Sequence, residues 1–275
     1  MGAMLRMLQV ILFIYTAFAL YIFLFADRMS SLPPGTAYDY RPNQDPTAIR
    51  ILTGDGNVIA ARYLPHPESR YTILYSHGNA SNLGSILPTL QSLQGSGFSV
   101  FAYDYPGYGY STGRPTEGNA YNAIEAAYSY LTDQLDVPSA QIILYGQSLG
   151  GGPSTYLATK QPVAGLILES TFATIFQVVV PIRILPFEKF PNIRRIANIN
   201  CPLLLIHGTG DQTIPFSHSE ELFAAAVEPK QLVVIAQANH NDIRLVDETT
   251  YLNAIQKFSE SLESQNSDAS RPTAR

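Results

Sequence analysis

The chain has 275 residues, of which 46% are hydrophobic and 14% charged, and its formal net charge at pH 7 is -5. This size allows one large core, and the mild negative charge offers no basic field for nucleic acid, so we expect no nucleic-acid partner. The single cysteine, Cys201, excludes an intramolecular disulfide framework and argues against a structural zinc site.

The first hydrophobic run, residues 7–26, contains no charged side chain and is flanked by Arg6 and Asp27. About 20 apolar residues rising ~1.5 Å each can span the ~30 Å hydrocarbon core of a bilayer. A cleaved signal peptide has a shorter apolar centre and a small-x-small site, which residues 24–26 match poorly. We therefore predict a single-pass membrane anchor over residues 1–28, which would contact membrane lipid. A signal peptide and a buried helix are the alternatives.

Residues 29–46 are rich in proline and polar side chains and are predicted to be a tether. Two short apolar runs, residues 48–53 and 58–64, then bracket Gly54-Asp55-Gly56. Short apolar runs separated by a glycine-containing turn predict a β-hairpin.

The following sequence alternates between buried strands and amphipathic helices. Strands are predicted at residues 71–76, 98–103, 141–145, 163–169, 202–207 and 231–236, and helices at residues 83–93, 117–131, 217–226 and 248–262. This alternation predicts an α/β fold with a doubly wound, mostly parallel sheet entered by an N-terminal antiparallel hairpin, in which sites lie at the carboxyl ends of strands. The domain would cover residues 47–263 and be followed by a disordered tail, residues 264–275.

One candidate site is the Gly-x-Ser-x-Gly sequence at residues 146–150, which directly follows a predicted strand. Glycines at these positions permit a tight strand-to-helix turn that exposes the hydroxyl of Ser148 as a nucleophile. An ordinary glycine-serine turn is the alternative, because the pattern also occurs by chance.

A serine nucleophile needs a base and an acid. Asp211 follows the strand at residues 202–207, and His240 follows the strand at residues 231–236, so both are expected at the same sheet edge as Ser148. Individually, Asp211 could merely cap a helix and His240 could be an ordinary loop residue. Asp242 is a second candidate, as a helix cap or a substitute acid. Together the order Ser, Asp, His predicts a catalytic triad.

Acyl transfer also needs backbone donors for an oxyanion. We expect these from Leu149, directly after the nucleophile, and from Asn79 in the loop after residues 71–76, with Ala80 as the second candidate. His77 is expected to shape this loop through a hydrogen bond.

Two further segments are expected near the site. The turn at residues 104–111 carries glycines without the full Gly-x-Gly-x-x-Gly pattern, so we interpret it as a rigid wall of the site rather than a phosphate loop. The apolar segment at residues 171–200 is predicted to be a small hydrophobic lid suited to an acyl chain. Packing of this segment into the core is the alternative.

These motifs resemble the α/β-hydrolase domain family of membrane-associated serine hydrolases that includes the protein depalmitoylases. The matching stretches are residues 77–80, 104–113, 146–151, 190–193, 207–211 and 240–242, within a resemblance that runs from about Ile73 onward. It implies that Ser148 is the nucleophile, Asp211 the acid and His240 the base. Two features differ: those depalmitoylases have an acylated, cysteine-rich amino terminus, whereas this chain has no cysteine before Cys201, and Asn239 stands where relatives often have glycine.

The function expected is therefore hydrolysis of carboxylic esters or thioesters, on acyl-protein or lipid-like substrates, through an acyl-enzyme and without a metal or organic cofactor. A serine peptidase is the alternative within enzymes, since the same triad cleaves amides. A membrane scaffold that retains the fold without catalysis is the alternative from another class.

Overall fold

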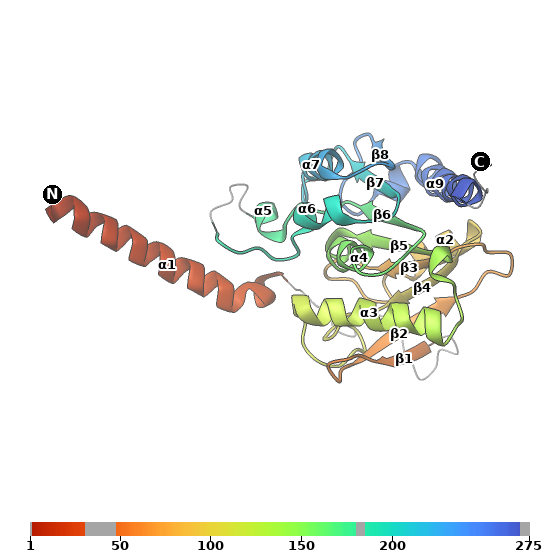
Figure 1. Ribbon diagram of the computed structural model, residues 1–275, viewed down its shortest axis with the longest axis horizontal. Coiled ribbons are helices and arrows are strands. Elements are labelled where there is room, and N and C mark those ends of the chain that lie inside the picture. The colour runs from red at the N-terminus through yellow and green to blue at the C-terminus, as the bar shows by residue number, and fades with distance from the viewer. Residues whose placement is uncertain (1, 31–47, 180–184, 270–275) are drawn as a thin grey trace, which may run out of the picture.

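The computed structural model of the protein describes residues 2–30, 48–179 and 185–269. Its centre is an eight-stranded sheet in the order β1-β2-β4-β3-β5-β6-β7-β8 (Figure 1). β1 pairs antiparallel with β2, and β2 with β4, whereas all other neighbours are parallel. The strands are β1 (Ala48–Leu52), β2 (Val58–Leu64), β3 (Thr72–Ser76), β4 (Ser99–Tyr103), β5 (Ile142–Gln147), β6 (Gly165–Glu169), β7 (Leu203–Gly208) and β8 (Lys230–Ile235). The predicted hairpin and mostly parallel sheet are confirmed.

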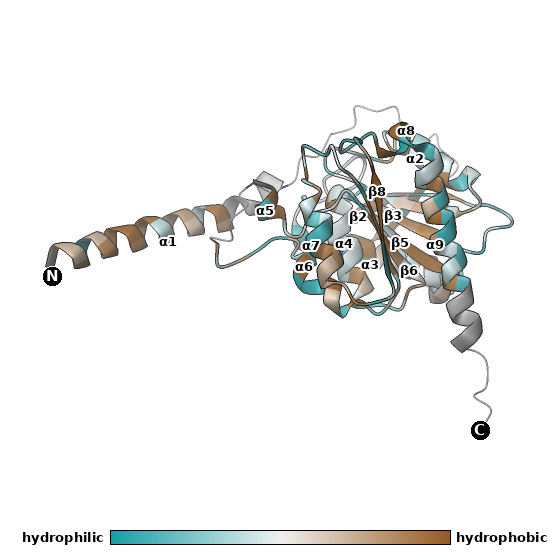
Figure 2. Ribbon diagram, turned by 90° about the horizontal axis from the view of Figure 1, so that it is seen from above, coloured by the Kyte–Doolittle hydropathy of each residue, from teal (hydrophilic) through white to brown (hydrophobic). Residues whose placement is uncertain are grey.

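Helices cover both faces of this sheet (Figures 1 and 2). The α-helices of the described residues are α1 (Gly2–Ser30), α2 (Leu87–Gly95), α3 (Glu117–Asp133), α4 (Gly151–Ala158), α5 (Ile175–Val179), α6 (Asn192–Arg195), α7 (Ser217–Ala225), α8 (Ile243–Val246) and α9 (Glu248–Ala269), of which α1 lies apart from the sheet. Alternate side chains of β5 enter opposite cores, because successive residues of a strand point to opposite faces. Ile142 and Leu144 pack on the side of α3, α4 and α7, and Ile143 and Tyr145 on the side of α2 and α9.

Two helix starts follow from local chemistry. The predicted helix at residues 83–93 begins only at Leu87, which places Pro88 in its first turn, where a missing N–H costs no helical hydrogen bond. α3 begins after Thr116, whose Oγ1 accepts a hydrogen bond from the Asn119 N–H at 3.1 Å. Such a side-chain cap satisfies one of the unpaired donors at the helix start.

α1 projects away from the α/β domain and is hydrophobic along much of its length (Figure 2). Residues Ala3–Phe23 are long and apolar enough to cross a membrane, and only 6% of an apolar 18-residue window within them is buried. A signal sequence has the same properties. Near its C-terminal end the Phe23 ring meets the Phe187 ring edge-on at 5.3 Å, so the helix contacts the predicted lid.

The segment at residues 171–200 divides its apolar side chains between the core and the site. Phe172 and Phe190 are 2% exposed and belong to the core, as the alternative interpretation expects. Ile175 and Val178, on α5, line a cavity beside Ser148, as the lid interpretation expects. Residues 180–184 lie outside the described part of the chain.

The predicted borders at the two ends differ from the structure. α1 runs to Ser30, so residues 29–30 of the predicted tether are helical, and residues 31–47 lie outside the described part. α9 continues to Ala269, so residues 264–269 are helical where the sequence predicts a disordered tail. Extending an existing helix avoids the cost of a new nucleus, which explains why a polar run can remain helical.

Candidate active site

Ser148 stands in a tight turn between β5 and the helical segment that leads into α4. Its backbone φ is +51°, which is strained for a residue with a side chain. A Cβ on Gly146 would lie 2.5 Å from the Gly150 carbonyl oxygen, and one on Gly150 would lie 1.9 Å from the Ser76 carbonyl oxygen. Both glycines of the motif are therefore required by space, as expected of a nucleophile elbow.

Ser148, His240 and Asp211 form one chain of hydrogen bonds. His240 Nε2 is 2.9 Å from Ser148 Oγ, and His240 Nδ1 is 2.7 Å from Asp211 Oδ2. An ionised carboxylate can only accept, so Nδ1 carries the proton and Nε2 is left to accept one from the serine hydroxyl. All three residues are less than 10% exposed. The arrangement can withdraw the proton of Ser148 while Asp211 stabilises the imidazolium that results.

The Asp211 carboxylate is kept ionised by its surroundings. Burial acts to raise its pKa, but hydrogen bonds from His207, His240 and the Ile214 N–H outweigh burial and hold the pKa well below its usual 3.8. Oδ1 also accepts from the Thr213 N–H at 2.9 Å. His207, in β7, is fully buried, and its Nε2 lies 3.2 Å from Asp211 Oδ2.

The loops that carry the acid and the base are tied together by Asn239. Its Oδ1 accepts from the Gln212 N–H at 3.2 Å and from the His240 N–H at 2.8 Å. Asp242, the other candidate acid, uses Oδ1 to accept from the Asn239 N–H at 2.6 Å, while the His240 ring is bonded to Asp211. The asparagine before the histidine therefore links the two loops.

The loop proposed to supply an oxyanion donor lies beside the elbow. A Cβ on Gly78 would stand 3.4 Å from Ser148 Cβ, and Asn79 and Leu149 both line the cavity. Tyr108 Oη donates to Asn79 Oδ1 at 2.7 Å, which engages the side-chain oxygen of Asn79. Ala80, the second candidate, is not among the described residues that line the cavity.

The turn at residues 104–111 does not form a wall of the cavity, contrary to expectation, because none of it lies among the described lining residues. Its tyrosine side chains instead donate hydrogen bonds that stabilise the loop carrying Asn79. Tyr105 Oη donates to the His77 carbonyl oxygen at 2.7 Å, in addition to the bond from Tyr108. Gly109 has φ +48°, and a Cβ there would lie 2.0 Å from Asp104 Oδ2, so this turn requires a glycine.

The cavity at Ser148 has a volume of about 280 Å³ and opens to solvent. Its polar side holds the elbow and the loops, and its apolar side is built by the segment after β6 and by the loop after β7. The lining residues are Gly78, Asn79, Gln147, Ser148, Leu149, Phe172, Ile175, Val178, Thr213, Ile214, His240 and Asn241. A pocket with a nucleophile at one wall and apolar side chains at the other fits an acyl group.

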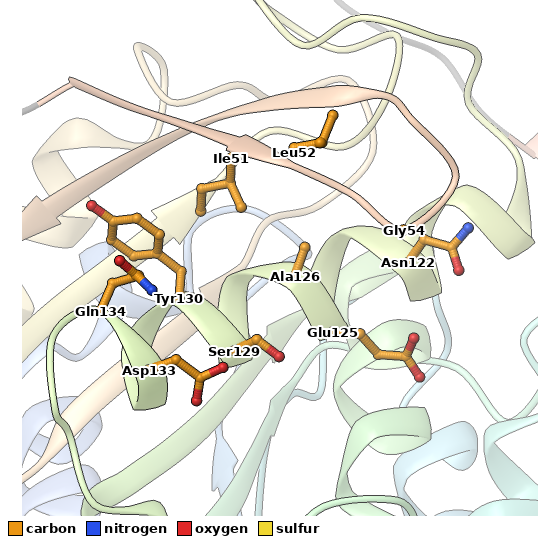
Figure 3. Close-up of a pocket in the computed structure, with 10 residues that line it drawn as sticks. All are labelled: Ile51, Leu52, Gly54, Asn122, Glu125, Ala126, Ser129, Tyr130, Asp133 and Gln134. Carbon is orange, nitrogen blue, oxygen red and sulfur yellow. The ribbon is translucent and has the colours of Figure 1, made fainter.

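Another hollow of about 390 Å³ lies between β1 and α3 (Figure 3). In Figure 3 Ile51 points from the strand toward the helix, which carries a row of mostly polar side chains, whereas Leu52 points away from the helix. It holds two carboxylates, Glu125 and Asp133, but no histidine, lysine or cysteine among its described lining residues. Glu125 Oε1 accepts from Tyr156 Oη and Asp133 Oδ1 from Thr132 Oγ1, so neither carboxylate is directed at a nucleophile of this hollow, and we do not treat it as a candidate catalytic site.

The structure places a buried carboxylate, that of Glu169, near the elbow, and the sequence had not indicated it as part of the site. Burial raises the pKa of Glu169, at the end of β6, and hydrogen bonds from Tyr145, Tyr251 and Gln147 offset part of this effect. Tyr75 Oη donates to Gln147 Oε1 at 3.0 Å. A glutamate that ends an otherwise apolar strand was the available signal. Its network fixes the side chain of Gln147, which lines the cavity.

The surroundings of Cys201 do not favour a cysteine nucleophile. Burial raises the pKa of the Cys201 thiol to about 12, which opposes formation of a nucleophilic thiolate. Among the described residues, no three histidine, cysteine, aspartate or glutamate side chains cluster in a way that could hold a metal ion.

The sheet order and the turn at Ser148 define the class of protein, which is an α/β hydrolase. A family profile described as alpha/beta hydrolase fold matches residues 71–195. An esterase from Pyrococcus furiosus has a similar fold, with a TM-score of 0.70 and 17% identity over 83% of this chain and 96% of that one.

Two relatives are more similar in sequence. Human alpha/beta hydrolase domain-containing protein 17B is 39% identical over 226 residues, 80% of this chain and 77% of the human protein. The Caenorhabditis elegans alpha/beta hydrolase domain-containing protein aho-3 is 39% identical over 200 residues, 70% of this chain and 59% of the nematode protein. The chain belongs to the family of α/β hydrolase domain-containing proteins that the sequence resembles.

Proposed function

We propose that the protein is a membrane-anchored serine hydrolase that cleaves carboxylic esters or thioesters. The observation that carries the proposal is the chain of hydrogen bonds from Ser148 Oγ through His240 to Asp211. In this proposal, residues 1–28, at α1, cross the membrane once and anchor the protein. Residues 47–263 form the catalytic domain. The length and apolar character of Ala3–Phe23 support this division.

In the proposed reaction the Ser148 hydroxyl proton passes to His240 Nε2 as Oγ attacks the acyl carbonyl carbon. The backbone N–H groups of Asn79 and Leu149 donate to the resulting oxyanion. When the carbonyl re-forms, the bond to the alcohol or thiol breaks and the leaving group takes the proton from His240. Water then attacks the acyl-enzyme, again losing a proton to His240, and the carboxylic acid departs as Ser148 regains its proton.

The cavity and the family both support this substrate class. Ile175, Val178 and Phe172 offer an apolar surface next to the nucleophile, which suits an acyl chain. The resemblance to the family that includes the protein depalmitoylases supports acyl-protein thioesters or lipid-like esters. No cofactor is required by this chemistry.

Labelling with a fluorophosphonate probe tests the proposal directly. An activated serine attacks the phosphorus and displaces fluoride, so we expect covalent labelling of the folded protein at Ser148. The modified residue is identified by mass spectrometry of peptides, and heat-denatured protein serves as the control. Labelling at another residue, or none on folded protein, would contradict catalysis by Ser148 and favour the scaffold alternative.

Filling the apolar side of the cavity should shift the preferred acyl chain length. We expect Ile175→Trp to lower kcat/KM for an octanoyl ester by about tenfold or more relative to an acetyl ester, because one misfit in an apolar pocket is worth ~1–3 kcal/mol. The comparison is made with p-nitrophenyl esters and the corresponding thioesters. Val227→Trp, at a side chain that is 57% exposed and outside the cavity lining, is the control. An unchanged ratio of kcat/KM between the two esters would show that the acyl chain of the substrate does not lie against α5.

A further inference from the structure

Two buried side chains hold carbonyl groups directly behind the proposed oxyanion donors. His77 Nδ1 is 2.8 Å from the Gly78 carbonyl oxygen, and Thr171 Oγ1 donates to the Ser148 carbonyl oxygen at 2.8 Å. A carbonyl can only accept, so His77 Nδ1 carries the proton of its bond. Gly78 and Ser148 are the residues that immediately precede Asn79 and Leu149.

These contacts determine where the two donor N–H groups point. A trans peptide is planar, and its C=O and the following N–H point in opposite directions. A side chain that holds the Gly78 carbonyl therefore also sets the direction of the Asn79 N–H. The same relation joins the Ser148 carbonyl to the Leu149 N–H. The residues of both peptides line the cavity. Because each carbonyl is turned toward His77 or Thr171, the N–H of the same peptide points away from that buried side chain.

The structure around Thr171 leaves room for its hydroxyl group to bond the Ser148 carbonyl. Thr171 is fully buried just after β6, and a Cβ on Gly151 would lie 2.0 Å from its Oγ1, so a glycine there makes room for the hydroxyl. The Ser148 carbonyl also accepts from the Gly151 N–H, within the helical turn. Because Ser148 has φ +51°, a bond from outside that turn opposes relaxation of the strained residue.

His77 is held equally firmly. Its ring is fully buried and packs against the Tyr105 ring, with centroids 4.5 Å apart. Nε2 lies 3.4 Å from Asp104 Oδ1, an oxygen that also accepts from the Leu83 N–H. The ring therefore cannot turn away from the Gly78 carbonyl without disturbing several neighbours.

We propose that Thr171 and His77 are positioning residues that preorganise the oxyanion site, each by holding the carbonyl of one donor peptide. The inference rests on the proposed function and extends it to side chains that contact neither the substrate nor the nucleophilic oxygen. Preorganised donors act in the transition state rather than in the ground state, so loss of an anchor should lower kcat with little change in KM.

Thr171→Val removes the hydroxyl and preserves the branched shape, whereas Thr171→Ser retains the hydroxyl. We expect Thr171→Val to lower kcat for p-nitrophenyl acetate by about tenfold to a hundredfold, less than the ~10²–10³ that follows complete loss of a donor. KM should change less than twofold, and the affinity for a trifluoromethyl ketone, which forms a tetrahedral adduct, should fall with kcat. Thr171→Ser should recover most of both. The matched control is Thr155→Val, at a fully buried hydroxyl without a hydrogen-bond partner in the described part of the chain.

His77→Asn tests the second anchor, because its amide nitrogen can replace the Nδ1 donor, and His77→Leu removes the donor. We expect the asparagine variant to retain at least tenfold more kcat than the leucine variant, with thermal melts reporting on folding. Normal kcat and ketone affinity in Thr171→Val, or equal losses in Thr171→Val and Thr171→Ser, would overturn the inference while leaving the proposed function intact. A wild-type protein that neither labels nor hydrolyses esters would overturn the proposed function, and the inference with it.

Discussion

Replacing Ser148 with alanine is expected to lower kcat for ester hydrolysis by a factor on the order of 10⁴ to 10⁶, because no other group can form the acyl-enzyme. The remaining site retains His240, Asp211 and the oxyanion donors, so residual turnover should come from direct attack by water. Substrate binding should survive, since the removed oxygen acts on the reacting carbon rather than on the acyl chain. Steady-state kinetics on wild type and Ser148→Ala, with short-chain and long-chain esters and thioesters, give the measurement.

The matched control for this variant is Ser154→Ala. Ser154 lies six residues further on, in α4, and is fully buried, with a hydroxyl that has no hydrogen-bond partner in the described part of the chain. Its replacement should leave kcat within about threefold of wild type. If Ser148→Ala retained ester hydrolysis, the nucleophile would have to be assigned elsewhere. If both variants lost activity together with thermal stability, the loss would reflect folding of α4.

The candidate site could be located from the sequence because of a property of parallel sheets. Their strands end at one edge, so residues that follow buried apolar runs meet there. Ser148, Asp211 and His240 each follow such a run, after β5, β7 and β8 respectively, and the structure brings them within hydrogen-bond distance. The strands themselves were readable because both faces of the sheet are covered, which makes the runs continuously apolar.

The supporting contacts could not be predicted in the same way, because they depend on which strands are neighbours. Gln147 stands beside Glu169 only through the register between β5 and β6. Thr171 reaches the Ser148 carbonyl across the same pair of strand ends, from 23 positions along the chain. The residue types alone indicate no partner. A tyrosine-rich turn at residues 104–111 likewise gives no sign that it supports the Asn79 loop rather than lining the cavity.

Asp211→Asn is expected to lower kcat by about 10⁴, as loss of the acid does in other triads. Asparagine can donate to His240 Nδ1, which favours the tautomer that carries its proton on Nε2, and that nitrogen can then no longer accept the proton of Ser148. Asp242→Asn is the control because Asp242 was the other candidate acid. Its Oδ1 accepts from the Asn239 N–H, which an amide oxygen can also do, so we expect less than a tenfold loss. The opposite ranking of the two variants would assign the acid to Asp242.

Asp211→Asn should also change how the free energy of unfolding depends on pH. Hydrogen bonds from two histidines and a backbone N–H hold the pKa of Asp211 below its usual 3.8, despite burial, so ionisation of this group favours the folded state. That contribution is fully present above the pKa of the unfolded chain and is lost as the pH falls through the lower folded-state pKa. The difference in free energy of unfolding between wild type and Asp211→Asn should therefore shift progressively against wild type as the pH falls below about 4. Urea unfolding at several pH values measures it, and a difference that did not change below pH 4 would mean that Asp211 is not held ionised by these contacts.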